Sequence, residues 1–221
     1  MSAAVRRRAR SMLPAGALAA ALALSGCSPP AAGEDVHEHA EPPAAVEAPL
    51  DRYAGLDLVE PYRRPTFTLT DTTGAPYDFQ AATAGSPTLL FFGYTNCPDI
   101  CPTTMADVAV ALRGLDPAIV SRVKVVFVTT DPAVDTPTVL AEYLGRFDAD
   151  LPISFVGLTG DQAAIDQAQL SAGVPLAEDQ GRLHSSLLLL SGTGDEAQVA
   201  FDAGNTARDI ADDLARVAGD A

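Results

Sequence analysis

The chain of 221 residues carries 29 acidic and 14 basic residues, which gives a formal net charge of −15, and it has no Trp. Its length suits one globular domain with a targeting segment and a linker, without a second core. The acidic surface repels phosphate backbones, so nucleic-acid binding is excluded. The acidic net charge can instead keep the protein soluble, or attract cations or basic partner surfaces.

Residues 1–26 have the pattern of a bacterial signal peptide. Four arginines precede an apolar run at residues 12–24, which is too short to span a membrane comfortably. The run ends in small residues before Cys27, and this ending resembles a lipobox. The resemblance implies cleavage before Cys27, a lipid on its sulfur, and an extracytoplasmic domain anchored to the cell membrane. The alternative is an ordinary signal peptide followed by an incidental cysteine.

Residues 27–60 are rich in Pro, Ala and Glu and have no periodic apolar pattern, so we expect a disordered linker. His37 and His39 lie in this segment and form a weak metal-binding pattern, but a solvated linker is the favoured interpretation because no fixed geometry would hold the rings. Cleavage at Cys27 removes four basic residues and no acidic one, so the processed chain carries −19.

Residues 61–218 are expected to form the folded domain, with strands and helices alternating along the chain. The turn around Gly74 predicts a hairpin of residues 66–70 and 77–79. Continuous apolar runs predict buried strands at residues 88–94, 123–128 and 185–190, and shorter strands are expected at 153–156 and 199–201. Helical spacing predicts helices at residues 102–112, 137–147 and 161–172, and a last helix from a cap at Asn205 to Val217. This order is an α/β fold with a mixed sheet that helices cover on both faces.

Cys97 and Cys101 stand between a predicted buried strand and a predicted helix. The N-terminus of a helix stabilises thiolate, and Asp99 is expected to cap it. Three intervening residues place the sulfurs on one helix face, where they could converge on an ion or form a disulfide. Two thiolates favour Cu(I) or zinc, but a closed zinc site needs four ligands and the folded segment offers only one further candidate, His184.

Residues 92–103, FGYTNCPDICPT, resemble the signature of the SCO/SenC family, the copper chaperones of cytochrome oxidase assembly. Further matching motifs follow in order: VTTDP at 128–132 with DTP at 135–137, GLTG at 157–160, and LHS at 183–185. The resemblance covers residues 61–218 and implies a thioredoxin-like fold with an added N-terminal β-hairpin.

The resemblance also implies a role for individual residues. Cys97 and Cys101 would be thiolate ligands of copper, or a redox-active disulfide pair, and His184 would be the imidazole ligand. Asp131 and Asp135 would lie near the site, where they tune it or meet a partner. The implied role is delivery of copper to the dinuclear copper site of a cytochrome c oxidase subunit, or reduction of that site's cysteines. Another copper carrier is a further implied partner.

A dedicated thiol–disulfide oxidoreductase is the alternative function, with Cys97 attacking and Cys101 resolving. General oxidoreductases of the thioredoxin type carry a proline before the strand that faces their cysteines. Residues 181–185 contain His184 there and no proline, which favours metal binding. A peroxidase is not expected, because the threonine that peroxiredoxins place three residues before the reactive cysteine is Tyr94 in this chain.

Overall fold

The computed structural model of the protein describes residues 52–179 and 181–219. The expected signal peptide, the expected lipidation site at Cys27 and most of the expected linker lie outside the described residues.

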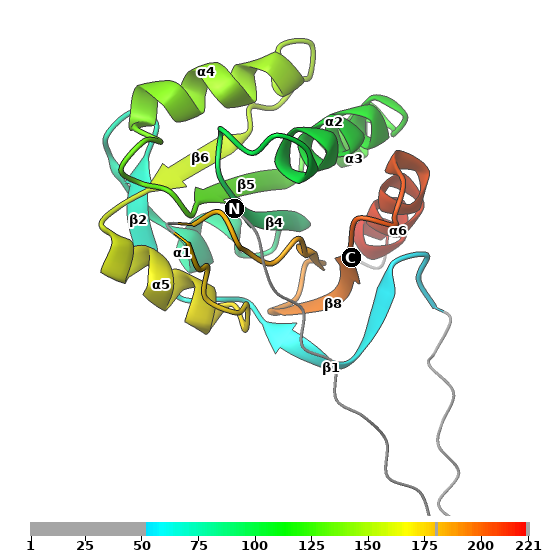
Figure 1. Ribbon diagram of the computed structural model, residues 1–221. Helices are drawn as coiled ribbons and strands as arrows, with labels where there is room; N and C mark the ends of the chain where they lie inside the picture. The colour runs from blue at the N-terminus through cyan, green and yellow to red at the C-terminus, as the bar shows by residue number, and fades with distance from the viewer. Residues whose placement is uncertain (1–51, 180, 220–221) are drawn as a thin grey trace, which may run out of the picture. The chain divides into compact units, whose positions relative to one another are not determined.

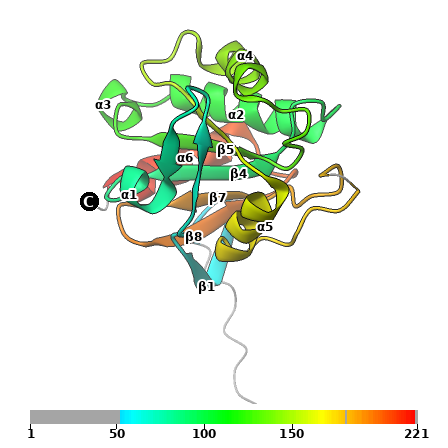
Figure 2. The ribbon, with the colours of Figure 1, turned by 90° about the vertical axis from the view of Figure 1, so that its left-hand side faces the viewer.

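Within the described residues, eight strands form one mixed sheet in the order β1-β8-β7-β4-β5-β6-β2-β3 (Figures 1 and 2). The strands are β1 (Leu56–Arg63), β2 (Thr68–Asp71), β3 (Pro76–Asp78), β4 (Thr88–Gly93), β5 (Lys124–Thr129), β6 (Val156–Thr159), β7 (Leu188–Ser191) and β8 (Glu196–Phe201). The central strand β4 is parallel to β5 and antiparallel to β7. Its six residues are all buried, as expected for a strand that helices cover on both faces.

Two apolar cores lie on opposite faces of this sheet, because successive side chains of a strand point to opposite sides. Leu89 and Phe91 of β4 pack into the first core with α2 (Ile100–Arg113), α4 (Pro137–Asp148) and α6 (Ala207–Gly219). Leu90 and Phe92 pack into the second core with α5 (Gln162–Ser171) and the β2–β3 hairpin. Two short helices, α1 (Phe79–Thr83) and α3 (Pro117–Val120), complete the fold.

The predicted α/β order and the predicted hairpin are confirmed. Strands β2 and β3 pair antiparallel, and Asp71 closes their turn by accepting hydrogen bonds from the backbone N–H groups of Thr73 (2.8 Å) and Ala75 (3.0 Å). Gly74 occupies the left-handed region at φ 85°, which explains the glycine in this turn.

Several sequence-based boundaries need correction. The strand expected at residues 185–190 begins at Leu188, and the strand expected at 199–201 begins at Glu196. Strand β1 begins at Leu56, inside the expected linker, and its mostly exposed residues pair with β8, so the segment has no apolar run to mark it. The strand expected at residues 153–156 is instead β6, which begins at Val156, where pairing with β5 starts. The last helix is capped by Thr206, which exchanges hydrogen bonds with Asp209, while Asn205 binds the backbone N–H of Asp202.

Across residues 52–179 and 181–219, no helix combines the length and the apolar character that membrane crossing requires.

Candidate metal centre

Three loops meet at one end of the sheet, which we call the sulfur end. Parallel strands β4 and β5 both finish there, at Gly93 and Thr129. Strand β7 runs the opposite way and starts there, because Leu188 pairs with Phe91. The loops before α2, after β5 and before β7 therefore converge at this end, where the sequence places the cysteines, the aspartates and the histidine.

The cysteine loop enters α2 through a tight turn. The backbone N–H of Cys97 donates to the carbonyl of Tyr94 (3.2 Å), and the backbone N–H of Cys101 donates to Cys97 Sγ (3.4 Å). Asp99 holds the N-cap position of α2 but its side chain makes no capping hydrogen bond, so the prediction that it caps the helix is wrong. The sulfur of Cys97 takes that acceptor role, because the turn aims it at the free N–H groups of the first helical turn.

The two thiols have opposite environments. Cys97 is half-buried, and this burial opposes ionisation of its thiol. Hydrogen bonds from the backbone N–H groups of Cys101, Asp99 and Ile100 outweigh that effect and hold the pKa of the thiol below its ordinary value. Cys101 is fully buried, and this burial is the main cause that raises the pKa of its thiol. Ionisation of Cys101 therefore needs a cation beside it.

His184 faces the buried thiol. Its Nε2 lies 3.5 Å from Cys101 Sγ, and its Nδ1 lies 2.8 Å from the carbonyl oxygen of Ser185. A carbonyl only accepts hydrogen bonds, so Nδ1 carries the proton and Nε2 presents its lone pair to the sulfurs. The edge-on rings of Tyr94 and Phe91, with centroids 5.6 and 6.1 Å from the imidazole, hold the ring in this orientation.

Cys97 Sγ, Cys101 Sγ and a ring nitrogen of His184 all lie within 4.8 Å of one another. Ligands that share one ion at bond lengths of about 2.0–2.3 Å stand about 4 Å apart, so a displacement of about 1 Å brings all three onto it. Two thiolates and one imidazole form a soft donor set, which suits Cu(I) better than magnesium or calcium.

Asp135 is buried and holds the cysteine loop against β5. One of its carboxylate oxygens accepts hydrogen bonds from the backbone N–H of Thr95 (3.0 Å) and from Thr129 Oγ1 (2.6 Å), and the other accepts from Thr95 Oγ1. Thr95 lies two residues before Cys97, so the carboxylate positions the loop that carries the thiol. The family resemblance implied that Asp135 lies near the site, whereas neither threonine could be singled out from the sequence, because their role depends on the packing of two loops.

Asp131 lies in the same loop, four residues before Asp135. It lines a hollow of about 560 Å³ together with Arg182 and Gln162, and burial raises the pKa of its carboxyl. Its carboxyl accepts a hydrogen bond from the backbone N–H of Val134, within its own loop and not from a metal ligand. Its tuning role therefore remains a prediction.

Two glycines allow the close approaches that the centre needs. A Cβ at Gly93 would lie 2.7 Å from Cys101 Sγ, so only glycine lets β4 pass beneath the sulfur. A Cβ at Gly181 would lie 2.1 Å from the carbonyl oxygen of Thr130, and Gly181 has φ 84°. Thr130 Oγ1 donates to the Gly181 carbonyl (2.8 Å), which fixes the loop of His184 onto the end of β5. A glycine in this loop is the signal that sequence reasoning could have used.

The family model described as SCO1/SenC matches residues 60–219. The chain belongs to the SCO1/SenC family. Among its relatives, a Stutzerimonas stutzeri protein named for copper binding is 35% identical over 155 residues, which span 65% of this chain and 74% of that protein. The chain spans a smaller share, 30%, of the mitochondrial SCO2 protein of Saccharomyces cerevisiae.

Solved structures of SCO1/SenC proteins share the fold. Bradyrhizobium japonicum ScoI, solved with copper bound, is 33% identical with a TM-score of 0.56, over 71% of this chain and 99% of that one. BsSco, described as a member of the Sco family of cytochrome c oxidase assembly proteins with a disulfide switch, is 25% identical with a TM-score of 0.54, over 74% of this chain and 95% of that one. These likenesses and the sheet order confirm the thioredoxin-like fold with an added hairpin.

Proposed function

We propose that this protein is a copper metallochaperone that holds copper through Cys97, Cys101 and His184. It delivers the metal to the dinuclear copper site of cytochrome c oxidase. The observation that carries the proposal is the convergence of two sulfurs and one unprotonated imidazole nitrogen within 4.8 Å. The copper-bound ScoI structure and the oxidase-assembly description of BsSco support the cargo and the destination.

The surroundings of the three ligands allow the protein both to hold a copper ion and to release it to a partner. Three protein ligands leave room for a fourth donor from a partner, so the metal can pass by ligand exchange. Cys101 is fully buried and Cys97 is half-buried, so an incoming ligand reaches the metal from the side of Cys97. The carbonyl of Ser185 fixes the imidazole tautomer, which keeps Nε2 available whenever the metal arrives or leaves.

Competition titration against a Cu(I) chelator tests the proposal. We expect one copper per protein, and we expect Cys97→Ser, Cys101→Ser and His184→Ala each to weaken affinity by about tenfold or more. Leu183→Ala is the matched control, because Leu183 adjoins His184 and its side chain is 63% exposed. Wild-type affinity in the His184 or Cys97 variant would rule out this ligand set.

A dedicated oxidoreductase is the second candidate, because the helix start holds the pKa of Cys97 below its ordinary value. His184 favours metal holding, since its Nε2 faces the thiol that a resolving cysteine would need free. We expect no multiple turnover in an insulin-reduction assay. Sustained turnover by the metal-free protein, abolished in Cys97→Ser, would favour the oxidoreductase instead.

The proposal includes export and a membrane tether at Cys27, supported by the basic and apolar pattern of residues 1–26 and by the small residues before the cysteine. The mature protein then begins at Cys27, extracytoplasmic and anchored by lipid. Mass spectrometry of the membrane fraction is expected to find an acylated N-terminal Cys27, and an unmodified cysteine there would refute the anchor.

A further inference from the structure

A hollow of about 200 Å³ opens between the start of α2, the start of β7 and the end of β8. Asp99 and Ile100, which lie between Cys97 and Cys101 in the chain, form one wall. Ser186, two residues after His184, belongs to another wall. A side chain that enters this hollow therefore meets residues that adjoin the proposed metal ligands along the chain.

The floor of the hollow is apolar. It consists of side chains from four elements at the edge of the first core: Ile100, Leu188, Phe201 and Ile210. Three of them, Leu188, Phe201 and Ile210, are at most 3% exposed, so the floor is a fixed surface of the folded core. Such a floor favours the hydrocarbon part of an incoming side chain.

The rim carries three carboxylates, Asp99, Asp107 and Asp202, and we call the whole hollow the acidic pocket. Among the described residues, none of the three forms an ion pair, and the carboxylate of Asp202 accepts a hydrogen bond from the backbone N–H of Gly204 (2.8 Å). Burial raises the pKa of Asp107, with no described cation beside it to oppose that rise. The pocket therefore presents negative charge that no described cation neutralises.

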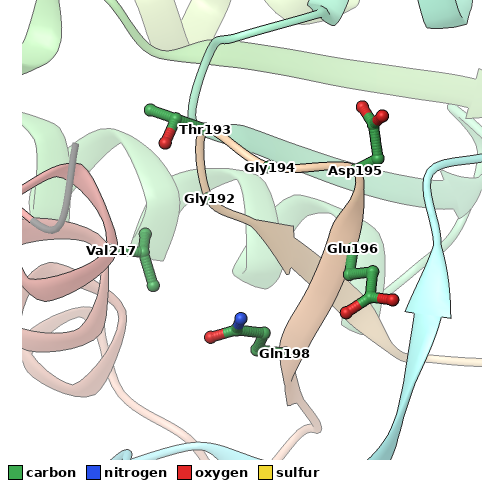
Figure 3. Close-up of a pocket in the computed structure, with 7 residues that line it drawn as sticks. All are labelled: Gly192, Thr193, Gly194, Asp195, Glu196, Gln198 and Val217. Carbon is green, nitrogen blue, oxygen red and sulfur yellow. The ribbon is translucent and has the colours of Figure 1, made fainter.

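Two other hollows lack this combination. The hollow in Figure 3 lies between the β7–β8 turn and the end of α6, and its Asp195 lies 3.9 Å from the guanidinium of Arg64. The hollow beside Asp131 contains Arg182, which pairs with Asp179 at 2.9 Å, so both signs of charge meet there. The acidic pocket alone among these three joins an apolar floor to carboxylates that form no ion pair.

We infer that the acidic pocket receives a basic side chain of the protein that exchanges copper with this site. The inference rests on the proposed function, because it names the surface that such a partner grips. An arginine or lysine fits both parts of the pocket, since its hydrocarbon stem covers the apolar floor while its charged head meets the carboxylates. A partner held there presents its own metal ligands to the half-buried Cys97.

Nuclear magnetic resonance titration of the Cu(I)-loaded protein tests the occupant. The probes are N-acetyl-Gly-Arg-Gly-amide and the same peptide with norleucine, which keeps a hydrocarbon stem but lacks the cation. We expect shift changes at the amides of Ile100, Ser186 and Phe201 with the arginine peptide only, and we expect Asp107→Asn/Asp202→Asn to remove them. Equal changes with norleucine, or changes spread evenly over the acidic surface, would overturn the inference.

Association with the soluble copper-site domain of the oxidase subunit tests the partner. At low ionic strength we expect Asp107→Asn/Asp202→Asn to lower the association rate constant by about tenfold. The matched control Glu60→Gln/Glu142→Gln removes two exposed charges away from the pocket and is expected to stay within about twofold. A similar loss in both double variants would mean that total charge, and not the pocket, steers the partner.

Copper affinity separates the two proposals. The pocket variants keep both sulfurs and the imidazole, so their Cu(I) affinity in chelator competition is expected to match that of the wild type. Intact copper binding with undiminished association in Asp107→Asn/Asp202→Asn would refute the pocket and leave the metallochaperone standing. Loss of copper binding only in the ligand variants supports the metallochaperone independently of the pocket.

Discussion

The two ends of the central sheet each contain a buried charged side chain, but they use it differently. At the sulfur end, Asp135 accepts hydrogen bonds from Thr95 and Thr129 and holds the loop of an open metal site. At the other end, which we call the arginine end, Arg64 is 3% exposed and joins the start of β4 to the β7–β8 turn.

Arg64 donates five hydrogen bonds at the arginine end. The acceptors are two threonine hydroxyls and three backbone carbonyls: Thr83 Oγ1, Thr88 Oγ1, Ser86 O, Gly192 O and Gly194 O, at 2.8–3.3 Å. At the sulfur end, by contrast, the thiols and Nε2 of His184 are left facing one another for a ligand. A buried charge can therefore tie the loops at one end of a sheet together, while another buried charge holds the opposite end open for chemistry.

Arg64→Met is expected to have the largest effect on stability. It leaves two buried threonine hydroxyls and three part-buried backbone carbonyls without their donor, so we expect a loss of about 4 kcal/mol of unfolding free energy. Urea unfolding measures the loss, and the folded fraction should bind copper as the wild type does because the sulfur end is untouched. Arg63→Met is the control, since Arg63 is exposed. A loss below about 1 kcal/mol for Arg64→Met would contradict the account of the arginine end.

Asp135→Asn is expected to destabilise the fold less than Arg64→Met does, but it is also expected to weaken copper binding. An amide replaces one of two acceptor oxygens, so we expect a loss of about 2 kcal/mol and weaker Cu(I) affinity as the loop before Cys97 loosens. Urea unfolding and chelator competition measure the two effects. Asp131→Asn serves as the control, and if it weakened copper binding as much as Asp135→Asn, hydrogen bonding to Thr95 would not be the cause.

Gly181→Ala is expected to displace the loop of His184. The added Cβ would meet the Thr130 carbonyl, and the residue has φ 84°, so we expect about 1–2 kcal/mol of lost stability together with weaker copper affinity. Gly74→Ala controls for backbone strain, because Gly74 has φ 85° but nothing within 4 Å of an added Cβ. The midpoint temperature of thermal unfolding should fall in both variants, whereas copper affinity should fall only in Gly181→Ala. Unchanged affinity in Gly181→Ala would show that this contact does not place the imidazole.

Alkylation rates should distinguish the two thiols in the wild-type protein, so this test requires no substitution. Iodoacetamide is expected to modify Cys97 first in the metal-free protein, because Cys101 is fully buried and burial raises its pKa. Since the pKa of Cys97 is held below its ordinary value, its reaction should persist at a lower pH than that of a free cysteine. Peptide mapping by mass spectrometry over a pH series measures both rates. Equal rates for the two cysteines would contradict the burial difference.

Much of the fold follows from local patterns. The apolar runs predicted β4, β5 and β7, helical spacing predicted α2, α4 and α5, and the turn at Gly74 predicted the hairpin, because each pattern is carried by neighbouring residues. Strand β1 was not predicted. It is held by pairing with β8, nearly 140 residues later in the chain, and its own side chains are mostly exposed. Partners distant in sequence leave no local signal.

In the metal centre, too, some features follow from the sequence and others only from the tertiary structure. The sequence by itself determined the reactive pair, because Cys97 and Cys101 are four residues apart at the start of one helix, and the family motifs pointed to His184. Only the tertiary structure decided that His184 Nε2 lies 3.5 Å from Cys101 Sγ and that Asp135 accepts hydrogen bonds from Thr95 and Thr129. It also decided that Asp99, at the N-cap position, makes no side-chain capping bond and lines the acidic pocket. The physical reason is that these contacts join loops that the sheet brings together through antiparallel β7 and parallel β5, and no spacing along the chain encodes them.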